Sequence, residues 1–500
     1  MKTILKPLAA MISVTLLYGC TAPSDIKPAN KLNKSSVLAH SQQLDNESLS
    51  SADWPKQQWW KSLHDEQLNE LIKLAMKHSP TIQMANANLR KASASVMAAD
   101  AQFEPQLSAQ GGVTRSRLSR SEDPLFQGSR YTTVYDLGLS GQYTFDLWGG
   151  QRDAWEASVN AQHAAAVDHQ AANITVASSI VSTYVKLASA YHLLDLAQKD
   201  YDRTRHIVSI TQQLLDNGLT SKDRLYTTQS NEASAKQDLK KRHLAVNQLK
   251  NALATMIGQG PDVAKSIKRP TAVLTTQLAL PKHLPANLLA HRPDLVAAKW
   301  RVEAATKNIA AAKTKFYPNL NLSAMAGFKA VLGDAMFEDP SRSWHVAPAI
   351  SLPIFTKNLK ADYIRKTADY DTAVAQYNRT LVKALGDVSD TIMALKSAEQ
   401  QLDDAKLSVQ LAEKSYHINE KRYQSGMGSH LDVLVAEQRL LHAESALVTL
   451  QNQQQEKQVM LVKVLGGGFY EPNNQQSGTA EHSTTTEHSG KTEQQHVKVK

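Results

Sequence analysis

The chain has 500 residues and a formal net charge of +9 at neutral pH, with few glycines, prolines and aromatic residues. Its lysines and arginines are interleaved with acidic residues and form no basic block, so the charge does not indicate a nucleic-acid partner. Alanine, leucine, glutamine and charged residues fill long uninterrupted stretches, which favours long helices over a series of compact globular domains.

The first residues have the pattern of a secretory signal. A basic start precedes an apolar run from Leu8 to Tyr18, which is too short for a membrane span of roughly 20 residues. The sequence around Cys20, the only cysteine, resembles the lipobox of bacterial lipoproteins. Because a secreted chain rarely keeps one unpaired thiol, we expect residues 1–19 to be removed and Cys20 to be acylated, for example with palmitate. The alternative is an ordinary signal with an incidental cysteine.

The residue after this cysteine, Thr21, bears on location. In the lipoprotein sorting rule that this start resembles, an aspartate there would favour the inner membrane. We therefore expect a lipid anchor in the outer membrane of a Gram-negative bacterium, with residues 20–50 as the lipidated linker. Later residues contain no other stretch of 18 apolar residues, so any membrane crossing must use strands.

The mature sequence contains one unit twice, and we expect the repeats to occupy residues 51–260 and 261–470. His78-Ser79-Pro80 and His291-Arg292-Pro293 each precede a helical stretch. Both stretches reach a Phe-x-Pro motif after the same number of residues. Such agreement at a fixed offset indicates an internal duplication. The remaining residues, 471–500, have the composition of a disordered polar tail.

Each repeat is expected to contain a β-hairpin, at about 106–146 and at about 319–354. Apolar residues alternate there with a period of two, most clearly at Thr133, Tyr135, Leu137, Leu139, Tyr143, Phe145, Trp344, Val346, Ile350 and Leu352. Strands of about ten residues suit a tilted transmembrane strand, whereas a soluble sheet would carry an unusual apolar load. Four strands cannot close a barrel, and open edges are not viable in lipid, so the chain is expected to oligomerise.

Long helical hairpins follow, at about 151–258 and 357–466. Their first arms contain no proline and almost no glycine, and their apolar residues recur at spacings of three and four, which is typical of coiled-coil packing. At ~1.5 Å per residue such a helix approaches ~100 Å. Each arm ends at a glycine-centred turn, around Gly218 or Gly426, where glycine permits the left-handed cap.

These features in this order resemble the TolC-type outer membrane factors, specifically their lipoprotein branch in multidrug efflux. The motifs that carry the resemblance are Trp54-Pro55 with Trp59-Trp60, Gln67-Leu68-x-x-Leu71-Ile72, Phe145-Asp146-Leu147-Trp148-Gly149, His291-Arg292-Pro293-Asp294-Leu295, Phe316-Tyr317-Pro318 and Leu352-Pro353-Ile354-Phe355. The resemblance implies a mixed, mainly α fold: a homotrimer whose twelve-stranded outer-membrane β-barrel continues as a periplasmic α-helical coiled-coil barrel, with two repeats per protomer. It further implies passive conduction, energised by an inner-membrane pump through a periplasmic adaptor.

The resemblance also implies a gate at the hairpin tips. In the family an aspartate six residues after the second tip glycine lines a constriction, and Asp432 stands there. Three such carboxylates in a narrow pore would repel one another and attract cations. Tyr423 matches a family tyrosine that ties neighbouring helix pairs together. The family's second acidic position is Val435 here, and its nearby arginine is Gly428, so the rest of that network is in doubt.

Equivalent positions in the two repeats suggest a further gate contact. Arg224, with Asp223 beside it, is as far from the first tip glycine as Asp432 is from the second. We therefore expect an Arg224–Asp432 pair in the closed state; the alternative for all four gate candidates is a solvated helix end or an i,i+4 surface pair. The adaptor would contact the two tips, although plain turns fit these residues equally: Gly218, Leu219, Thr220, Ser221, Gly426, Met427, Gly428 and Ser429.

No Ser/His/Asp, Cys/His or zinc-ligand spacing is present in the sequence, so we expect no catalysis, cofactor or metal site. The predicted function is the outer-membrane channel of a tripartite efflux system, with outer-membrane lipid as a further partner. Two alternatives stay open. One is the duct of a type I protein secretion system, and the other is a non-conducting structural coiled-coil lipoprotein.

Overall fold

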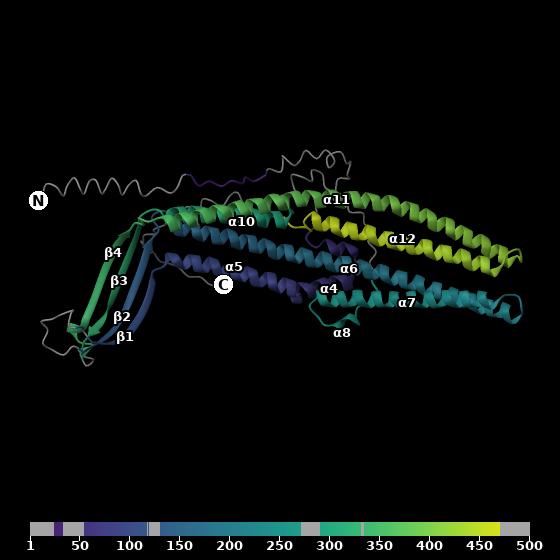
Figure 1. Ribbon diagram of the computed structural model, residues 1–500, viewed down its shortest axis with the longest axis horizontal. Helices are drawn as coiled ribbons and strands as arrows, with labels where there is room; N and C mark the ends of the chain where they lie inside the picture. The colour runs from purple at the N-terminus through teal and green to yellow at the C-terminus, as the bar shows by residue number, and fades with distance from the viewer. Residues whose placement is uncertain are drawn as a thin grey trace, which may run out of the picture.

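The computed structural model describes residues 25–33, 55–117, 119, 131–271, 291–331 and 335–470. The molecule is elongated: long helices run side by side, and a four-stranded sheet leaves one end of them at an angle (Figure 1). Cys20, most of the expected linker and the expected tail lie outside the described residues. The predicted mainly helical fold with a small antiparallel sheet is confirmed at this level.

The elements of the first half come in the order helix, two strands, long helix and return helix. They are η1 (Trp59–Leu63), α4 (Glu66–His78), α5 (Pro80–Asp100), η2 (Ala101–Phe103), β1 (Gln106–Arg117), β2 (Tyr131–Phe145), α6 (Gly150–Asp216), α7 (Lys222–Met256) and α8 (Pro261–Ala264). The second half has the same central order. Its elements are α10 (Pro293–Thr314), β3 (Asn319–Ala330), η4 (Asp339–Ser341), β4 (Arg342–Ser351), α11 (Lys357–Gln424) and α12 (His430–Val464).

The sheet is antiparallel in the order β1-β2-β3-β4, which leaves β1 and β4 as its edges. Its register places most of the large apolar residues of the four strands on one face: Leu139 pairs with Ala109 and Ala326, and Ala326 pairs with Trp344. The opposite face carries serine, threonine, asparagine and glutamine. None of the described residues covers this apolar face at Trp344, which is 77% exposed. This is the alternation of a sheet that meets an apolar medium on one side.

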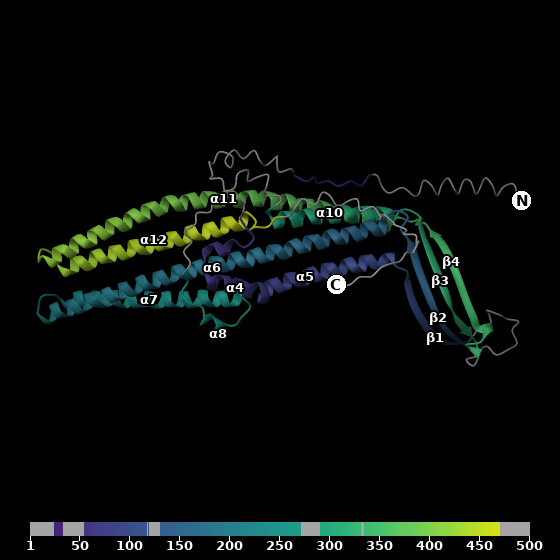
Figure 2. The same ribbon diagram turned by 180° about the vertical axis from the view of Figure 1, so that it is seen from behind.

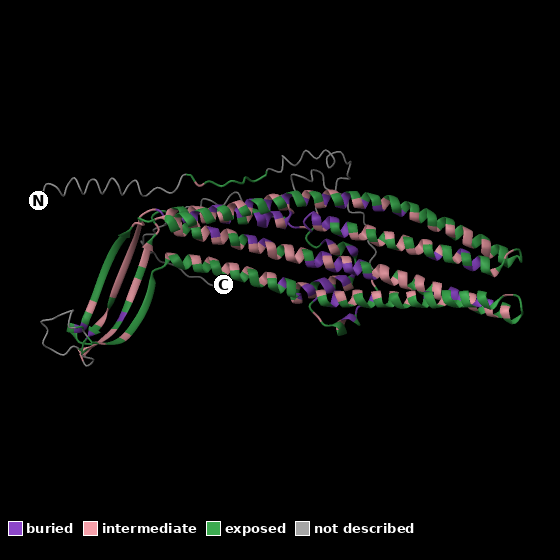
Figure 3. Ribbon diagram, viewed as in Figure 1, coloured by how far each residue is buried: buried purple, intermediate pink, exposed green. Residues whose placement is uncertain are grey.

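The core lies halfway along the helices, where buried residues gather in Figure 3. Apolar residues of α4, the middle of α6 and the ends of α7 and α12 meet there, and Ile180, Tyr184 and Leu187 of α6 are almost fully buried. Beyond this core the helices continue as two hairpins, α6–α7 and α11–α12, whose tips lie at the end opposite the sheet in both views (Figures 1 and 2). The hairpins therefore project from a fixed middle.

Glycine is required where the return helices end in the core. Gly466 has a φ of +94°, and a Cβ there would lie 1.8 Å from the His291 carbonyl oxygen. Gly258 is its counterpart, with a φ of +74°, and a Cβ at this position would lie 2.2 Å from the His78 carbonyl oxygen. At each His-x-Pro motif, therefore, the end of a return helix meets the start of the helix that leads into the strands of the same half.

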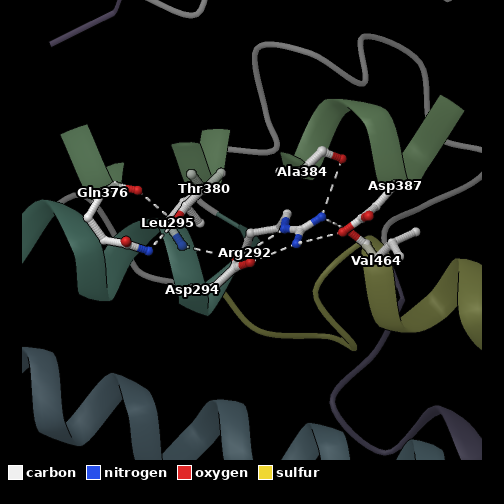
Figure 4. A network of polar contacts seen from close by, with 8 residues as sticks. All are labelled: Arg292, Asp294, Leu295, Gln376, Thr380, Ala384, Asp387 and Val464. Carbon is white, nitrogen blue, oxygen red and sulfur yellow. Dashed lines mark hydrogen bonds and ion pairs between the residues drawn. The ribbon is translucent and has the colours of Figure 1, made fainter. Parts of the chain in front are cut away.

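Arg292 fixes the second of these junctions (Figure 4). Its side chain is 9% exposed, and its guanidinium donates to both carboxylate oxygens of Asp294, at 3.0 and 2.7 Å. The remaining nitrogen donates to the carbonyls of Val464, at 3.2 Å, and Ala384, at 3.4 Å. The planar fork thus satisfies the last carbonyl of α12 and joins α10, α11 and α12.

No helix in the described ranges combines the length and the apolar character needed to cross a membrane.

The glycine junctions give a stability prediction. Gly466→Ala should destabilise the protein by more than about 3 kcal/mol, because it adds a steric clash with the His291 carbonyl to the ~1–2 kcal/mol cost of a left-handed alanine. Gly426→Ala is the matched control, since Gly426 has a φ of +74° but no atom within 4 Å of a Cβ. Apparent thermal midpoints at one scan rate should separate the two variants. Equal midpoints would contradict the close-approach argument.

Candidate functional site at the helical hairpin tips

The two tips have the same backbone construction. At the first tip Leu219 N–H donates to the Leu214 carbonyl at 2.7 Å, and at the second Met427 N–H donates to the Arg422 carbonyl at 2.8 Å. With Gly218 and Gly426 at positive φ, each tip is a Schellman cap that satisfies the last carbonyls of its long helix. Each turn is therefore closed by its own backbone hydrogen bonds and directs its return helix back along the hairpin.

The return helices begin with serine caps. Ser221 accepts a hydrogen bond from the Arg224 N–H at 3.4 Å, and Ser429 accepts one from the Asp432 N–H at 3.3 Å. In the second tip the Asp432 carboxylate also accepts from the Ser429 N–H at 3.2 Å, which completes a capping box. Asp432 therefore stabilises the start of α12 in addition to carrying a charge there.

The expected Arg224–Asp432 pair is not formed within the described part of the chain. The carboxylate of Asp432 turns back onto its own helix to cap it. Arg224 instead borders a small cavity of about 210 Å³ between the two hairpins, lined mainly by apolar residues: Ile207, Ile210, Thr211, Leu214, Leu219, Thr220, Thr228, Leu431 and Leu434. The two positions are equivalent in sequence, but local capping decides where the aspartate points.

Tyr423 does lie at a contact between helices. Its ring is 4.7 Å from that of His430, the first residue of α12, and the His430 ring is 5.1 Å from that of His206 on α6. The three rings thus connect both arms of the second hairpin to the first hairpin. Neither histidine was predicted from the sequence, since only the packing of α6 against α12 brings them together.

Arg203 is a further residue that was not predicted from the sequence. Its side chain is 4% exposed and forms an ion pair with Asp200, at 2.7 Å. It also donates to the Leu434 carbonyl of α12 at 3.3 Å. A buried arginine is costly unless its donors are satisfied, so this position is held firmly. Nothing in the α6 sequence alone distinguishes Arg203 from the exposed basic residues around it.

Burial also perturbs acidic and imidazole groups near the tips. Burial, followed by the charge of nearby His206, lowers the pKa of His430 below its usual value. Burial raises the pKa of Glu437, although Arg203 acts in the opposite direction. The neutral imidazole and the protonated carboxylic acid are therefore both favoured relative to free side chains.

The outermost residues of the tips are apolar and exposed. Leu219 is 72% exposed and Met427 is 70% exposed. Thr220, Asp223 and Gly428 complete the two tips, and whether an adaptor contacts them stays a prediction. Across the ranges that the structure covers, no three His, Cys, Asp or Glu side chains gather closely enough to hold a metal ion.

Comparison with known proteins gives three findings. A family model described as outer membrane efflux protein matches residues 71–259 and 284–467. The multidrug resistance outer membrane protein MdtP of Shigella flexneri is 27% identical over 468 residues, covering 91% of this chain and 95% of that protein. The crystal structure of the outer membrane protein VceC of Vibrio cholerae is similar at 34% identity and a TM-score of 0.75, covering 83% of this chain and 100% of that chain.

A second solved structure agrees in fold. The CmeC outer membrane channel of Campylobacter jejuni is 23% identical, with a TM-score of 0.79 over 90% of this chain and 95% of that chain.

Proposed function

The chain belongs to the outer membrane efflux protein family, and from this premise we propose that three copies form the outer-membrane duct of a tripartite efflux system. Drugs and other toxic small molecules would pass through the duct passively. The energy would come from an inner-membrane pump that is joined to the duct by a periplasmic adaptor. Each protomer would supply two repeats, 51–260 and 261–470, with one strand hairpin and one helical hairpin from each.

The sheet carries this proposal. One face is apolar and exposed, the other is polar, and the edge strands β1 and β4 have no partner within the described chain. In lipid, unpaired N–H and C=O groups on such edges find no water, so the sheet needs partner strands. Three copies give twelve strands, a number that can close around a water-filled lumen lined by the polar face.

Aromatic residues mark where the sheet meets the helices. Trp148 donates its indole N–H to the Pro318 carbonyl at 2.7 Å, and its ring lies 5.2 Å from that of Tyr317. Tryptophan and tyrosine are enriched at the boundary between lipid and water. This ring pair supports a membrane boundary at the strand–helix junction, with the helices extending into the periplasm.

A lipid anchor at Cys20 fits the described start of the chain. Asp25 forms an ion pair with Lys360 in the first turn of α11, at 3.4 Å, and Asp371 accepts hydrogen bonds from the backbone of Ala29 and Asn30. Asp25 is five positions after Cys20, so the two can lie at most about 18 Å apart. An acyl chain on Cys20 would therefore enter the membrane close to the sheet.

The tips would form the periplasmic mouth. Their exposed apolar residues suit contact with an adaptor, and three copies of Asp432 would form a carboxylate ring around the axis. Export of proteins by a type I system remains the second candidate function. The names of the relatives favour small molecules, since MdtP is described as a multidrug resistance protein.

Reconstitution tests the proposed function. In a Gram-negative strain that lacks outer-membrane efflux channels, the chain together with its own pump and adaptor should restore growth on dyes, detergents, bile salts or antibiotics. The purified protein should have the mass of a trimer and conduct ions in a planar bilayer. A trimer that stays silent in the bilayer would support the structural lipoprotein instead. Restored export of a protein without drug resistance would support type I secretion.

Replacing Asp432 separates its charge from its capping role. Asp432→Asn keeps an oxygen that can accept from Ser429 but removes the charge, so cation preference should fall by roughly fivefold, the effect of about 1 kcal/mol for an ion at 4 Å in water-like surroundings. Asp432→Ala should lose the same selectivity and also loosen the start of α12. Reversal potentials in a salt gradient measure this. Asp262→Asn, at an exposed position far along the chain from the tips, is the control.

The anchor has its own test. Cys20→Ala should abolish metabolic labelling with palmitate and leave the signal sequence uncleaved, because acylation of the thiol would precede cleavage in the expected lipoprotein pathway. Mass spectrometry of the purified N-terminus checks both points. An unlabelled wild-type chain would show that Cys20 is incidental.

A further inference from the structure

The two hairpins contact each other near their tips along one line, between α6 and α12. Among the described helices, α6 packs extensively against α12, whereas α7 makes no comparable contact with either arm of the second hairpin. We call the contact formed by Arg203 and His206 of α6 with His430 and Leu434 of α12 the tip seam. Asp432 lies within it in sequence, midway between His430 and Leu434.

The residues of the tip seam run in antiparallel order. Arg203 contacts the main chain of Leu434, and His206, one turn further along α6, contacts His430, one turn back along α12. The Arg203 contact is charged at every accessible pH, because guanidinium does not lose its proton in proteins. The ring contact differs, since an imidazole side chain can gain a proton between pH 5 and 8.

We propose that the tip seam is a proton-sensitive latch, in which Arg203 and the contact between the His206 and His430 rings hold the start of α12, and with it Asp432, against α6, and protonation at this ring contact releases it. This inference rests on the proposed function, since it assigns the seam the regulation of the channel mouth.

The charges around the seam support this direction. On α6 the ionisable neighbours are Lys199, Asp200 and Arg203, of which Asp200 is already paired with Arg203. On α12 the neighbours are Asp432 and Glu437, and on α11 it is Tyr423. Two imidazolium ions with ring centroids 5.1 Å apart would repel each other beside a buried guanidinium. The carboxylates of Asp432 and Glu437 on α12 oppose this repulsion; that of Asp432 is engaged in the capping box, and burial raises the pKa of Glu437.

The direction of the pH response follows from the linkage between proton binding and closure of the tip seam. Burial and the His206 charge depress the pKa of His430 in the folded chain, so the closed arrangement favours the neutral ring. The stability that neutral His430 gives to the closed seam is complete above the usual imidazole pKa of about 6.5. It is lost as the pH falls through the depressed pKa of His430. Acidification therefore opens the seam, and alkalinisation leaves it closed.

Hydrogen exchange on the full-length protein in lipid nanodiscs reads the seam directly. Between pH 7.5 and pH 5, after correction for intrinsic exchange rates, protection of the residue 430–437 amides should fall by roughly fivefold or more in the wild type, the lower end of typical coupling between sites. The double variant His206→Gln with His430→Gln should show no such fall. His206→Lys should already show low protection at pH 7.5, because it places a fixed charge at the seam.

The control is His417→Gln, since His417 pairs with Glu420 on α11 outside the seam and should leave the pH response of the wild type unchanged. A wild-type protein with flat protection, or a double variant with the same fall as the wild type, would overturn the latch. If the double variant also loses protection of the core amides near Ile180, its folding is disturbed. The protection of the His206→Lys variant at pH 7.5 then decides whether the latch is upheld. Exchange reports on the seam whether or not the protein conducts, so a silent bilayer would reject the proposed function and leave this test valid.

Discussion

The sheet cannot satisfy its own backbone, and the rest of the structure depends on that constraint. Four strands with one apolar face leave two open edges, and neither edge is covered within the described chain. In apolar surroundings each unpaired backbone group would cost several kcal/mol. In the proposed trimer, partner strands would solve this problem, and the partner chains would bring their long helices with them. The great length of α6 and α11, only a minority of whose residues are fully buried within one chain, is consistent with helices that pack against other copies.

The two halves of the chain are joined at places where their motifs touch. Trp148, which follows the first strand hairpin, donates a hydrogen bond to the Pro318 carbonyl that precedes the second. The two halves also differ in which buried polar residues they use. Arg292 is a buried arginine that closes the end of α12, whereas the equivalent position in the first half is Ser79. The first half instead uses Asp65, whose hydrogen bonds from Leu68, Tyr184 and Thr271 outweigh its burial and lower its pKa.

Sequence periodicity predicted the elements well because each one follows a local rule. Alternation at Leu137, Leu139 and Tyr143 falls on β2, and the tip glycines end α6 and α11 with the expected left-handed caps. The contacts between elements were harder to predict from the sequence. The Arg224–Asp432 pair was inferred from equal offsets, but a capping box is formed over three residues and competes successfully with a contact over two hundred. His206 and Arg203 could not be found, because their partners depend on the relative position of α6 and α12 along the bundle.

Burial along the helices explains why regulation would sit at the tips. The apolar core fixes the middle of α6 and the ends of α7 and α12, and Gly258 and Gly466 lock the return helices there through close backbone contacts. Beyond that core few residues are fully buried, so local opening of the tips costs far less than opening the middle. A small number of polar contacts can then decide whether the hairpins stay together. Arg203 supplies a permanent contact, and the imidazole contact supplies one that acidification would weaken, which is the property a reversible mouth requires.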